Sequence, residues 1–169
     1  MKAEERRAVI AQTLTADRPI SATALAGRFS VSRQIIVGDI ALLRAAGANI
    51  VSTPRGYLVP REVGGRLRTL VCRHSAAELE PELNIMVDNG CTVIDVAVEH
   101  PVYGQLSGRL ELSSRYDVGE FIRRVKEEGA KPLSVLTDGI HLHTLRCPDE
   151  DAFQRVRTAL DAAGFLVKE

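Results

Sequence analysis

Three short helices in close succession are predicted near the N-terminus, and their spacing restricts the fold more than any other feature of the chain. Apolar residues recur at helical spacing from Ala3 to Leu14. Ser21 is expected to cap a short second helix. Ser32 is expected to cap a third helix that ends at Gly47, because glycine favours helix C-termini. The pattern predicts a compact three-helix unit with a tight turn before its last helix.

A short hairpin is predicted directly after the third helix. Residues 50–52 and 57–59 read as strands, and the intervening Thr53-Pro54-Arg55-Gly56 has the composition of a turn. Helices followed by such a hairpin form a winged helix-turn-helix, predicted here for residues 1–60. In this fold the third helix enters the major groove of DNA by its N-terminal end, and the wing reaches phosphate or the minor groove. The residues expected to contact DNA are Ser32, Arg33, Gln34 and Arg55.

Charge is divided unevenly along the chain, although the formal net charge is zero. The first 60 residues carry 8 of the 22 basic and 4 of the 22 acidic side chains. The remainder therefore carries 14 basic and 18 acidic side chains. A basic N-terminal segment followed by an acidic remainder is expected of a DNA-binding domain joined to a second domain. This charge distribution argues against a trihelical domain that only binds protein.

The length of 169 residues suits two small domains. Residues 61–65 are predicted to form a linker, and residues 66–169 a second domain. No segment is long and apolar enough to cross a membrane, and the N-terminus lacks the apolar core of a signal peptide, so a cytoplasmic location is expected. The three cysteines, Cys72, Cys91 and Cys147, are far apart and form no Cys-x-x-Cys pair, so we expect buried free thiols.

The second domain is predicted to be a two-layer α+β sandwich, with helices on one face of a mainly antiparallel sheet. Residues 91–99 are expected to alternate regularly, with Val93, Asp95 and Ala97 on one face. Asp138-Gly139 is expected to form a hairpin turn between two strands. The order is similar to the β-α-β-β-α-β-α order of the histidine-containing phosphocarrier fold, but a fold alone does not imply phosphotransfer. The predicted strands are 67–72, 91–99, 105–112, 133–136 and 140–145, and the predicted helices are 75–90, 117–128 and 150–163.

The motif with the clearest chemistry is Gly-Ile-His-Leu-His-Thr at residues 139–144. Residues two apart in a strand share a face, so His141 and His143 would project together. His74 ends the first strand of this domain, and Glu82 lies on the next helix, so the four could supply three nitrogens and one oxygen. Such a set suits zinc, nickel, iron or cobalt better than magnesium or calcium. The alternative is a polar strand face in solvent.

Each of the two predicted domains also resembles a known protein family. Residues 25–57, which include Val31-Ser32-Arg33, Asp39-Ile40 and Gly56-Tyr57, resemble the winged-helix domains of the biotin-operon repressor class. His74, Glu82, the run Val98–Gly104 and the run Gly139–Thr144 together resemble the three-histidine, or 3H, domain, which follows a winged helix in a family that includes niacin-responsive repressors of NAD biosynthesis and transport.

The second resemblance implies a homodimer that binds operator DNA when nicotinic acid is bound. It also implies a divalent metal, with nickel or zinc favoured, held by the residues matching His74, Glu82, His141 and His143. The pyridine nitrogen of nicotinate could coordinate an open position on that ion, while an arginine or backbone N–H groups hold its carboxylate. The candidate arginines are Arg73, Arg109, Arg115 and Arg146, and the sequence does not choose among them.

His100 and Tyr103 lie in the run that carries the resemblance, and we expect them to line the effector pocket or to support a metal ligand. A purely structural role for His100 at a strand end is the alternative. The chain is not expected to be an enzyme. Three other functions remain open: a metalloenzyme acting on a pyridine carboxylate, a repressor that senses the metal itself, and, ranked lowest, a cysteine redox sensor.

Overall fold

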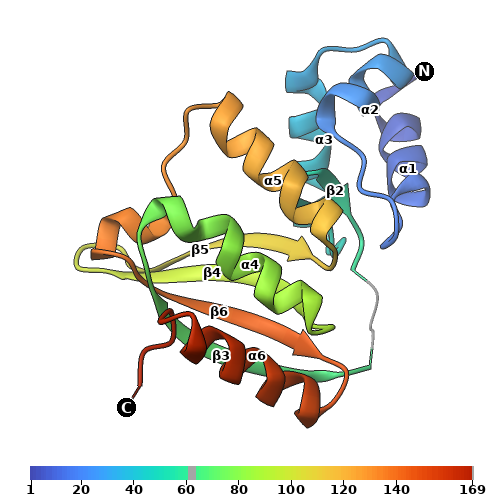
Figure 1. Ribbon diagram of the computed structural model, residues 1–169. Helices are drawn as coiled ribbons and strands as arrows, with labels where there is room; N and C mark the ends of the chain where they lie inside the picture. Colours follow the sequence, from blue (N-terminus) through green and yellow to red (C-terminus); the bar gives the residue numbers. More distant parts are fainter. Residues whose placement is uncertain (61–63, 169) are drawn as a thin grey trace. The chain divides into compact units, whose positions relative to one another are not determined.

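The computed structural model describes residues 1–60 and 64–168 and divides into two compact units, residues 1–63 and 64–169 (Figure 1). Of the predicted linker, residues 61–63 lie outside the described residues. Within the described parts of the chain, no helix has the length and apolar character needed to cross a membrane. The predicted α+β class is confirmed by the helical first unit and the sheet with its covering helices in the second.

The N-terminal unit has the predicted three helices and wing. The two serine caps form as expected, since the side chain of Ser21 accepts a hydrogen bond from Ala24 N at 3.0 Å and that of Ser32 accepts one from Ile35 N at 3.3 Å. The helices enclose a small apolar core that includes Ile10, Leu25, Ile36 and Ile40. The elements are α1 (Ala3–Thr13), α2 (Ala22–Phe29), α3 (Arg33–Ala45), β1 (Val51–Thr53) and β2 (Gly56–Leu58).

The wing is fixed to the helices by backbone pairing. Ile20 and Tyr57 exchange two backbone hydrogen bonds, at 3.0 and 2.9 Å. Gly56 adopts φ +130°, and a Cβ atom there would lie 2.4 Å from the carbonyl carbon of Ile20. Glycine is therefore needed beside Tyr57 for the wing to approach the segment before α2.

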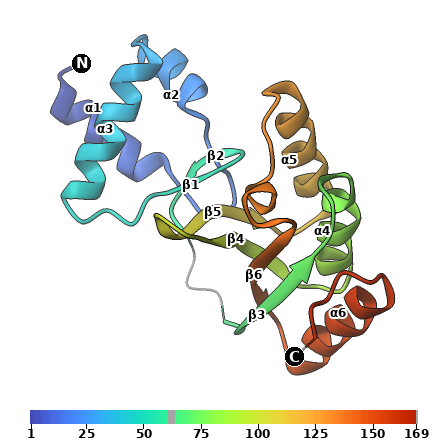
Figure 2. The same ribbon diagram turned by 90° about the vertical axis from the view of Figure 1, so that its left-hand side faces the viewer.

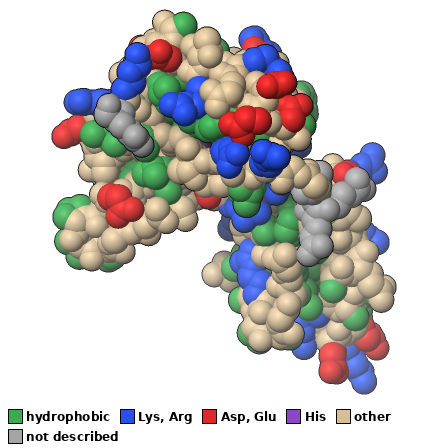
Figure 3. Space-filling model, turned by 90° about the horizontal axis from the view of Figure 1, so that it is seen from below, with side chains coloured by type: hydrophobic (Ala, Val, Ile, Leu, Met, Phe, Trp, Pro, Cys, Tyr) green, Lys and Arg blue, Asp and Glu red, His purple; other side chains and the backbone are tan. Residues whose placement is uncertain are grey.

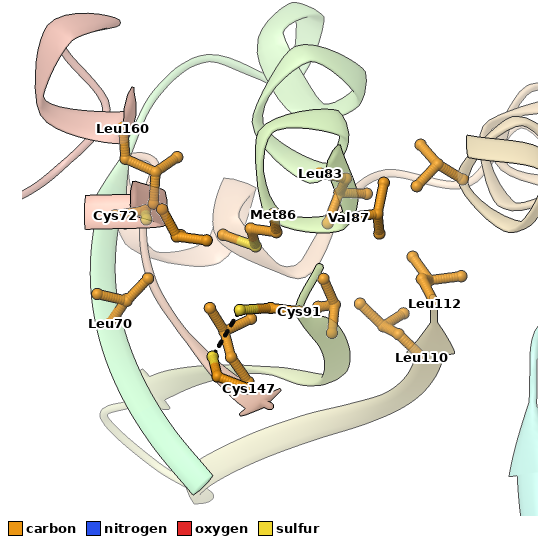
Figure 4. Packing of buried hydrophobic residues seen from close by; sticks show 14 of the residues in the cluster. Leu70, Cys72, Leu83, Met86, Val87, Cys91, Leu110, Leu112, Cys147 and Leu160 are labelled. Atoms are coloured by element: carbon orange, nitrogen blue, oxygen red, sulfur yellow. Dashed lines mark hydrogen bonds between the residues drawn. The ribbon is translucent and has the colours of Figure 1, made fainter. Parts of the chain in front are cut away.

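The C-terminal unit is built on a four-stranded antiparallel sheet in the order β3-β6-β4-β5. Its strands are β3 (Arg66–Arg73), β4 (Thr92–His100), β5 (Gly104–Leu112) and β6 (Ile140–Cys147). The helices α4 (Leu79–Asp88), α5 (Arg115–Glu127) and α6 (Glu150–Ala162) all cover one face (Figure 2). Leu83 of α4, Val118 of α5 and Val156 of α6 lie in a single core with the sheet. Figure 4 shows part of this core, with Leu83 of α4 and Leu160 of α6 near Leu70 of β3.

The predicted hairpin before β6 is wrong. Leu133–Thr137 forms the 3-10 helix η2, not a strand. β6 lies between β3 and β4, so both of its edges are already paired and no further strand can join it. Asp138 and Gly139 do adopt positive φ, at 52° and 92°, but they connect η2 to β6. The Asp-Gly signal thus located the turn correctly and misassigned the element before it.

Candidate metal centre and nucleic-acid interface

The four predicted metal ligands converge between α4 and the ends of β3 and β6. Glu82 Oε2 lies 2.6 Å from His74 Nε2, and Glu82 Oε1 lies 2.8 Å from His141 Nε2 and 3.3 Å from His143 Nε2. His141 and His143 project from β6 together, as predicted, but into the helix-covered face. All four side chains are buried, and no histidine is visible on the face in Figure 3. Their burial excludes the alternative of a solvent-facing polar strand.

The segment before α4 brings Glu82 to the histidines without distortion. Ser75 and Glu78 form the predicted capping box around the short 3-10 helix η1 (Ala76–Glu78). α4 then begins at Leu79, so Pro81 occupies its third position. Backbone N–H groups in the first turn have no partner within their helix, so a proline there breaks no helical bond. Glu82 follows at once and points to the sheet with its side chain fully buried.

Each of the three histidines is oriented by a backbone carbonyl. The Nδ1 atoms of His74, His141 and His143 lie 2.7, 2.8 and 2.7 Å from the carbonyl oxygens of Ser75, Gly139 and Asp95, respectively. A carbonyl oxygen only accepts, so each Nδ1 carries the hydrogen, and each neutral imidazole keeps its lone pair on Nε2. All three lone pairs therefore face Glu82. This is the arrangement in which backbone groups orient histidines that bind a metal.

A β-bulge in β4 supplies one of these carbonyls. The register shifts between Val93 and Asp95, so Val93 lies in the core and the regular alternation predicted for residues 91–99 is wrong there. At the bulge, Asp95 Oδ1 accepts the hydrogen bond from Thr144 N at 3.0 Å. The Asp95 side chain thus accepts a hydrogen bond that a backbone carbonyl would accept in a regular pair of strands. The backbone carbonyl of Asp95 is left to accept a hydrogen bond from His143 Nδ1.

The centre has an excess of acceptors that a cation would satisfy. His74 Nε2, His143 Nε2 and Glu82 Oε2 are buried without a hydrogen-bond partner. Burial by itself would lower the pKa of His143, but the charge of Glu82 outweighs it and the pKa is raised. Burial would likewise raise the pKa of Glu82, but the positive charge of protonated His143 and hydrogen bonds donated by the histidines hold it well below its usual range. The pocket therefore favours added positive charge, and three imidazoles with one carboxylate suit a transition-metal ion.

A fifth side chain, Cys72, reaches the centre, although it was not among the predicted ligands. Its sulfur, a Glu82 carboxylate oxygen and a His141 ring nitrogen lie within 4.8 Å of one another. Burial raises the pKa of the Cys72 thiol, and the neighbouring Glu82 charge raises it further. The sequence did hold a signal, since Cys72 precedes His74 by two residues. The expectation of buried free thiols is met by all three cysteines.

A cavity of about 510 Å³ adjoins the centre at the same end of the sheet. His74 and Gly139 form part of its wall, and Arg73 is its one basic residue. The other three candidate arginines do not line it. Arg115 pairs with Asp88, and Arg109 and Arg146 lie 2.8 and 3.8 Å from Glu111. The remaining lining residues are Ser75, Ala76, Ser134, Val135 and Asp138.

His100 and Tyr103 sit on the turn between β4 and β5. His100 Nδ1 accepts hydrogen bonds from the backbone N–H groups of Val102 and Tyr103, at 3.1 and 3.2 Å. The ring of Tyr103 lies 5.0 Å from that of His100 and is 75% exposed. These contacts favour the structural alternative for His100, and the effector role stays a prediction.

The start of α3 presents three of the four predicted DNA-contacting residues, Ser32, Arg33 and Gln34, to solvent. Arg33 and Gln34 are exposed, whereas Ile36 points into the core. Ile35 and Val37 are 43% and 41% exposed and offer apolar contact beside them, the kind that thymine methyl groups accept. The Ser32 hydroxyl caps the helix, and Arg55 lies on the turn of the wing. This surface fits the geometry of a recognition helix.

Fold and site together define a winged helix-turn-helix protein with a second domain that holds a cluster of three buried histidines. Comparison with known families matches residues 6–58 to an HTH domain and residues 67–169 to the 3H domain. The chain therefore belongs to the 3H-domain family and carries an HTH domain before the 3H domain.

Two curated relatives match over most of their length. The chain is 39% identical over 169 residues to "Probable transcription repressor NiaR" of Thermotoga maritima, covering all of this chain and 97% of that protein. It is 41% identical over 155 residues to "Transcription repressor NadR" of Bacillus subtilis, covering 89% and 86%. An uncharacterized protein of Methanothermus fervidus is 26% identical over 106 residues, which is 59% of this chain and 17% of that protein.

Proposed function

We propose that this protein is a transcription repressor of NAD biosynthesis or niacin uptake genes, with nicotinic acid as co-repressor and a divalent metal in the 3H domain. The DNA-binding repressor class, and with it the prediction that the chain is not an enzyme, is supported by the family and by both named relatives. A homodimer belongs to the proposal, because such repressors bind two half-sites on DNA. The cytoplasmic location expected from the sequence belongs to it as well. The effector and the metal rest on the resemblance and on the geometry of the centre.

The observation that carries the proposal is the convergence of three Nε2 lone pairs on one buried carboxylate beside a cavity. The residues that would hold the ion are His74, Glu82, His141 and His143. When bound, the ion would supply fixed positive charge and an open coordination position for the pyridine nitrogen of nicotinate. The protein itself orients the ligands and places Arg73 in the wall of the cavity.

Arg73 is proposed to hold the effector carboxylate. It alone of the four candidate arginines lines the cavity next to His74, and guanidinium groups bind carboxylates through paired, charge-assisted hydrogen bonds. Asp138 lines the same cavity, so the carboxylate is expected to lie on the Arg73 side.

Nicotinate titrated calorimetrically into nickel-loaded protein is expected to bind, and Arg73→Ala to weaken binding by about 10- to 100-fold, because charged hydrogen bonds contribute about 1.5–3 kcal/mol. Arg115→Ala is the matched control, since Arg115 forms an exposed pair with Asp88. Nicotinate that binds neither metal-loaded nor chelated protein would contradict the proposal. Operator binding that follows the metal and ignores nicotinate would identify a metal sensor, and turnover of nicotinate would identify an enzyme.

Arg33→Ala is expected to weaken operator binding by about 1–3 kcal/mol and to relax sequence preference at one base pair, because a bidentate arginine contact reads guanine. Arg55→Ala should instead weaken binding to all sequences and reduce the slope of log affinity against log salt by about one unit. Arg123→Ala, an exposed arginine of the 3H domain paired with Glu120 and Glu127, is the control. These effects are measured by fluorescence anisotropy on operator and scrambled duplexes over a salt series. Unchanged operator affinity in Arg33→Ala would show that the assumed placement of α3 in the groove is wrong.

A further inference from the structure

Cys72 is placed among the metal ligands by the sheet itself. It lies on β3 directly opposite His141 of β6, and its side chain is fully buried. The Cys72 sulfur, one carboxylate oxygen of Glu82 and one ring nitrogen of His141 all lie within 4.8 Å of one another. Cys72 thus borders the group of buried acceptors that includes His74 Nε2 and Glu82 Oε2, which lie 2.6 Å apart and lack a hydrogen-bond donor while His74 is neutral with its hydrogen on Nδ1.

We propose that Cys72 is a further ligand of the divalent ion, which makes the centre a mixed nitrogen, oxygen and sulfur site. This inference rests on the metal centre of the proposed function and adds a ligand that decides which ions the centre accepts. Thiolate selects softer ions such as zinc, cobalt and nickel over manganese and magnesium. On binding, the S–H bond of Cys72 breaks, the proton passes to solvent, and the sulfur donates an electron pair to the ion, so no oxidant or reductant is needed.

The other two cysteines cannot supply this ligand. Cys91 and Cys147 contact each other, with their sulfurs 2.6 Å apart (Figure 4). In the β3–β6 ladder Cys147 pairs with Arg66, whereas Cys72 pairs with His141. Six residues of strand separate these positions, a span of about 20 Å. Cys91 is therefore a matched control: a buried thiol of the same domain that lies outside the centre.

The test is absorption spectroscopy of the full-length protein loaded with cobalt(II). Wild type is expected to show both visible ligand-field bands and a near-ultraviolet thiolate-to-cobalt charge-transfer band. Cys72→Ser should lose the charge-transfer band and keep cobalt bound by the other four ligands, whereas Cys91→Ser should keep the band. If Cys72→Ser does not fold, as judged by far-ultraviolet circular dichroism, Cys72→Ala serves in its place.

The outcomes separate the two proposals. A wild-type protein that binds cobalt with visible bands but without charge transfer would overturn the role of Cys72 and leave the metal centre standing. A charge-transfer band that survives in the Cys72 variants would also overturn it. A wild-type protein that binds no cobalt at all would contradict the metal centre and the Cys72 ligand together.

Discussion

Chelation of the proposed divalent ion is expected to lower the Tm of the 3H domain by about 10–20 °C, and His141→Ala is expected to abolish this dependence on metal. An ion present at about 100 times its dissociation constant stabilises the folded state by about 2.7 kcal/mol. In a domain of about 100 residues each kcal/mol shifts the Tm by about 4–8 °C. His141 is the residue to remove because it contacts Glu82 through Nε2, is oriented by Gly139 through Nδ1, and is 1% exposed.

The measurement is differential scanning calorimetry with nickel, with zinc and with excess chelator. His100→Ala is the matched control, because His100 is the one histidine outside the centre and its Nδ1 binds only the adjoining turn. This variant should keep the full response to metal. Equal Tm values for wild type with and without chelator, after confirmed removal of the ion, would show that the four buried side chains form a polar cluster that needs no metal.

The parts of the centre that could be predicted from sequence are those set by local periodicity. His141 and His143 share a face because side chains alternate along a strand. The capping box that begins at Ser75 predicts the start of the helical segment that carries Glu82. The position of His74 at the end of the preceding predicted strand added it to the set, and the resemblance supported all four residues together. None of these inferences required knowledge of which strands are neighbours.

The parts that could not be predicted depend on strand neighbours and register. Cys72 enters the centre only because β3 pairs with β6 in the register that sets it opposite His141. The bulge at Asp95 breaks the alternation that a run of β-formers predicts. The hairpin prediction failed for the same reason, since the position of β6 between β3 and β4 excludes another partner. Arg73 stands out from the other arginines only once the cavity is known.

Gly139→Ala is expected to destabilise the 3H domain by about 2–5 kcal/mol and to weaken metal binding by about 10- to 100-fold. Gly139 has φ +92°, and a Cβ atom there would lie 2.5 Å from the carbonyl oxygen of His74. The left-handed conformation costs an alanine about 1–2 kcal/mol, and the close contact costs about 1–3 kcal/mol more. The backbone that must move carries His74 and the carbonyl that orients His141, and loss of such an orienting group weakens metal affinity by the stated factor.

Gly90→Ala separates the two causes, because Gly90 has a similar φ of +85° but open space where the Cβ atom would lie. It should show the conformational cost alone, about 1–2 kcal/mol in urea denaturation, with metal affinity unchanged. If Gly139→Ala matched Gly90→Ala in both stability and nickel affinity, the approach of the His74 backbone to the turn before β6 would have no part in shaping the centre. The expected difference between the two variants would show that this backbone contact helps to set the positions of His74 and His141, so that the turn and the metal ligands form one unit.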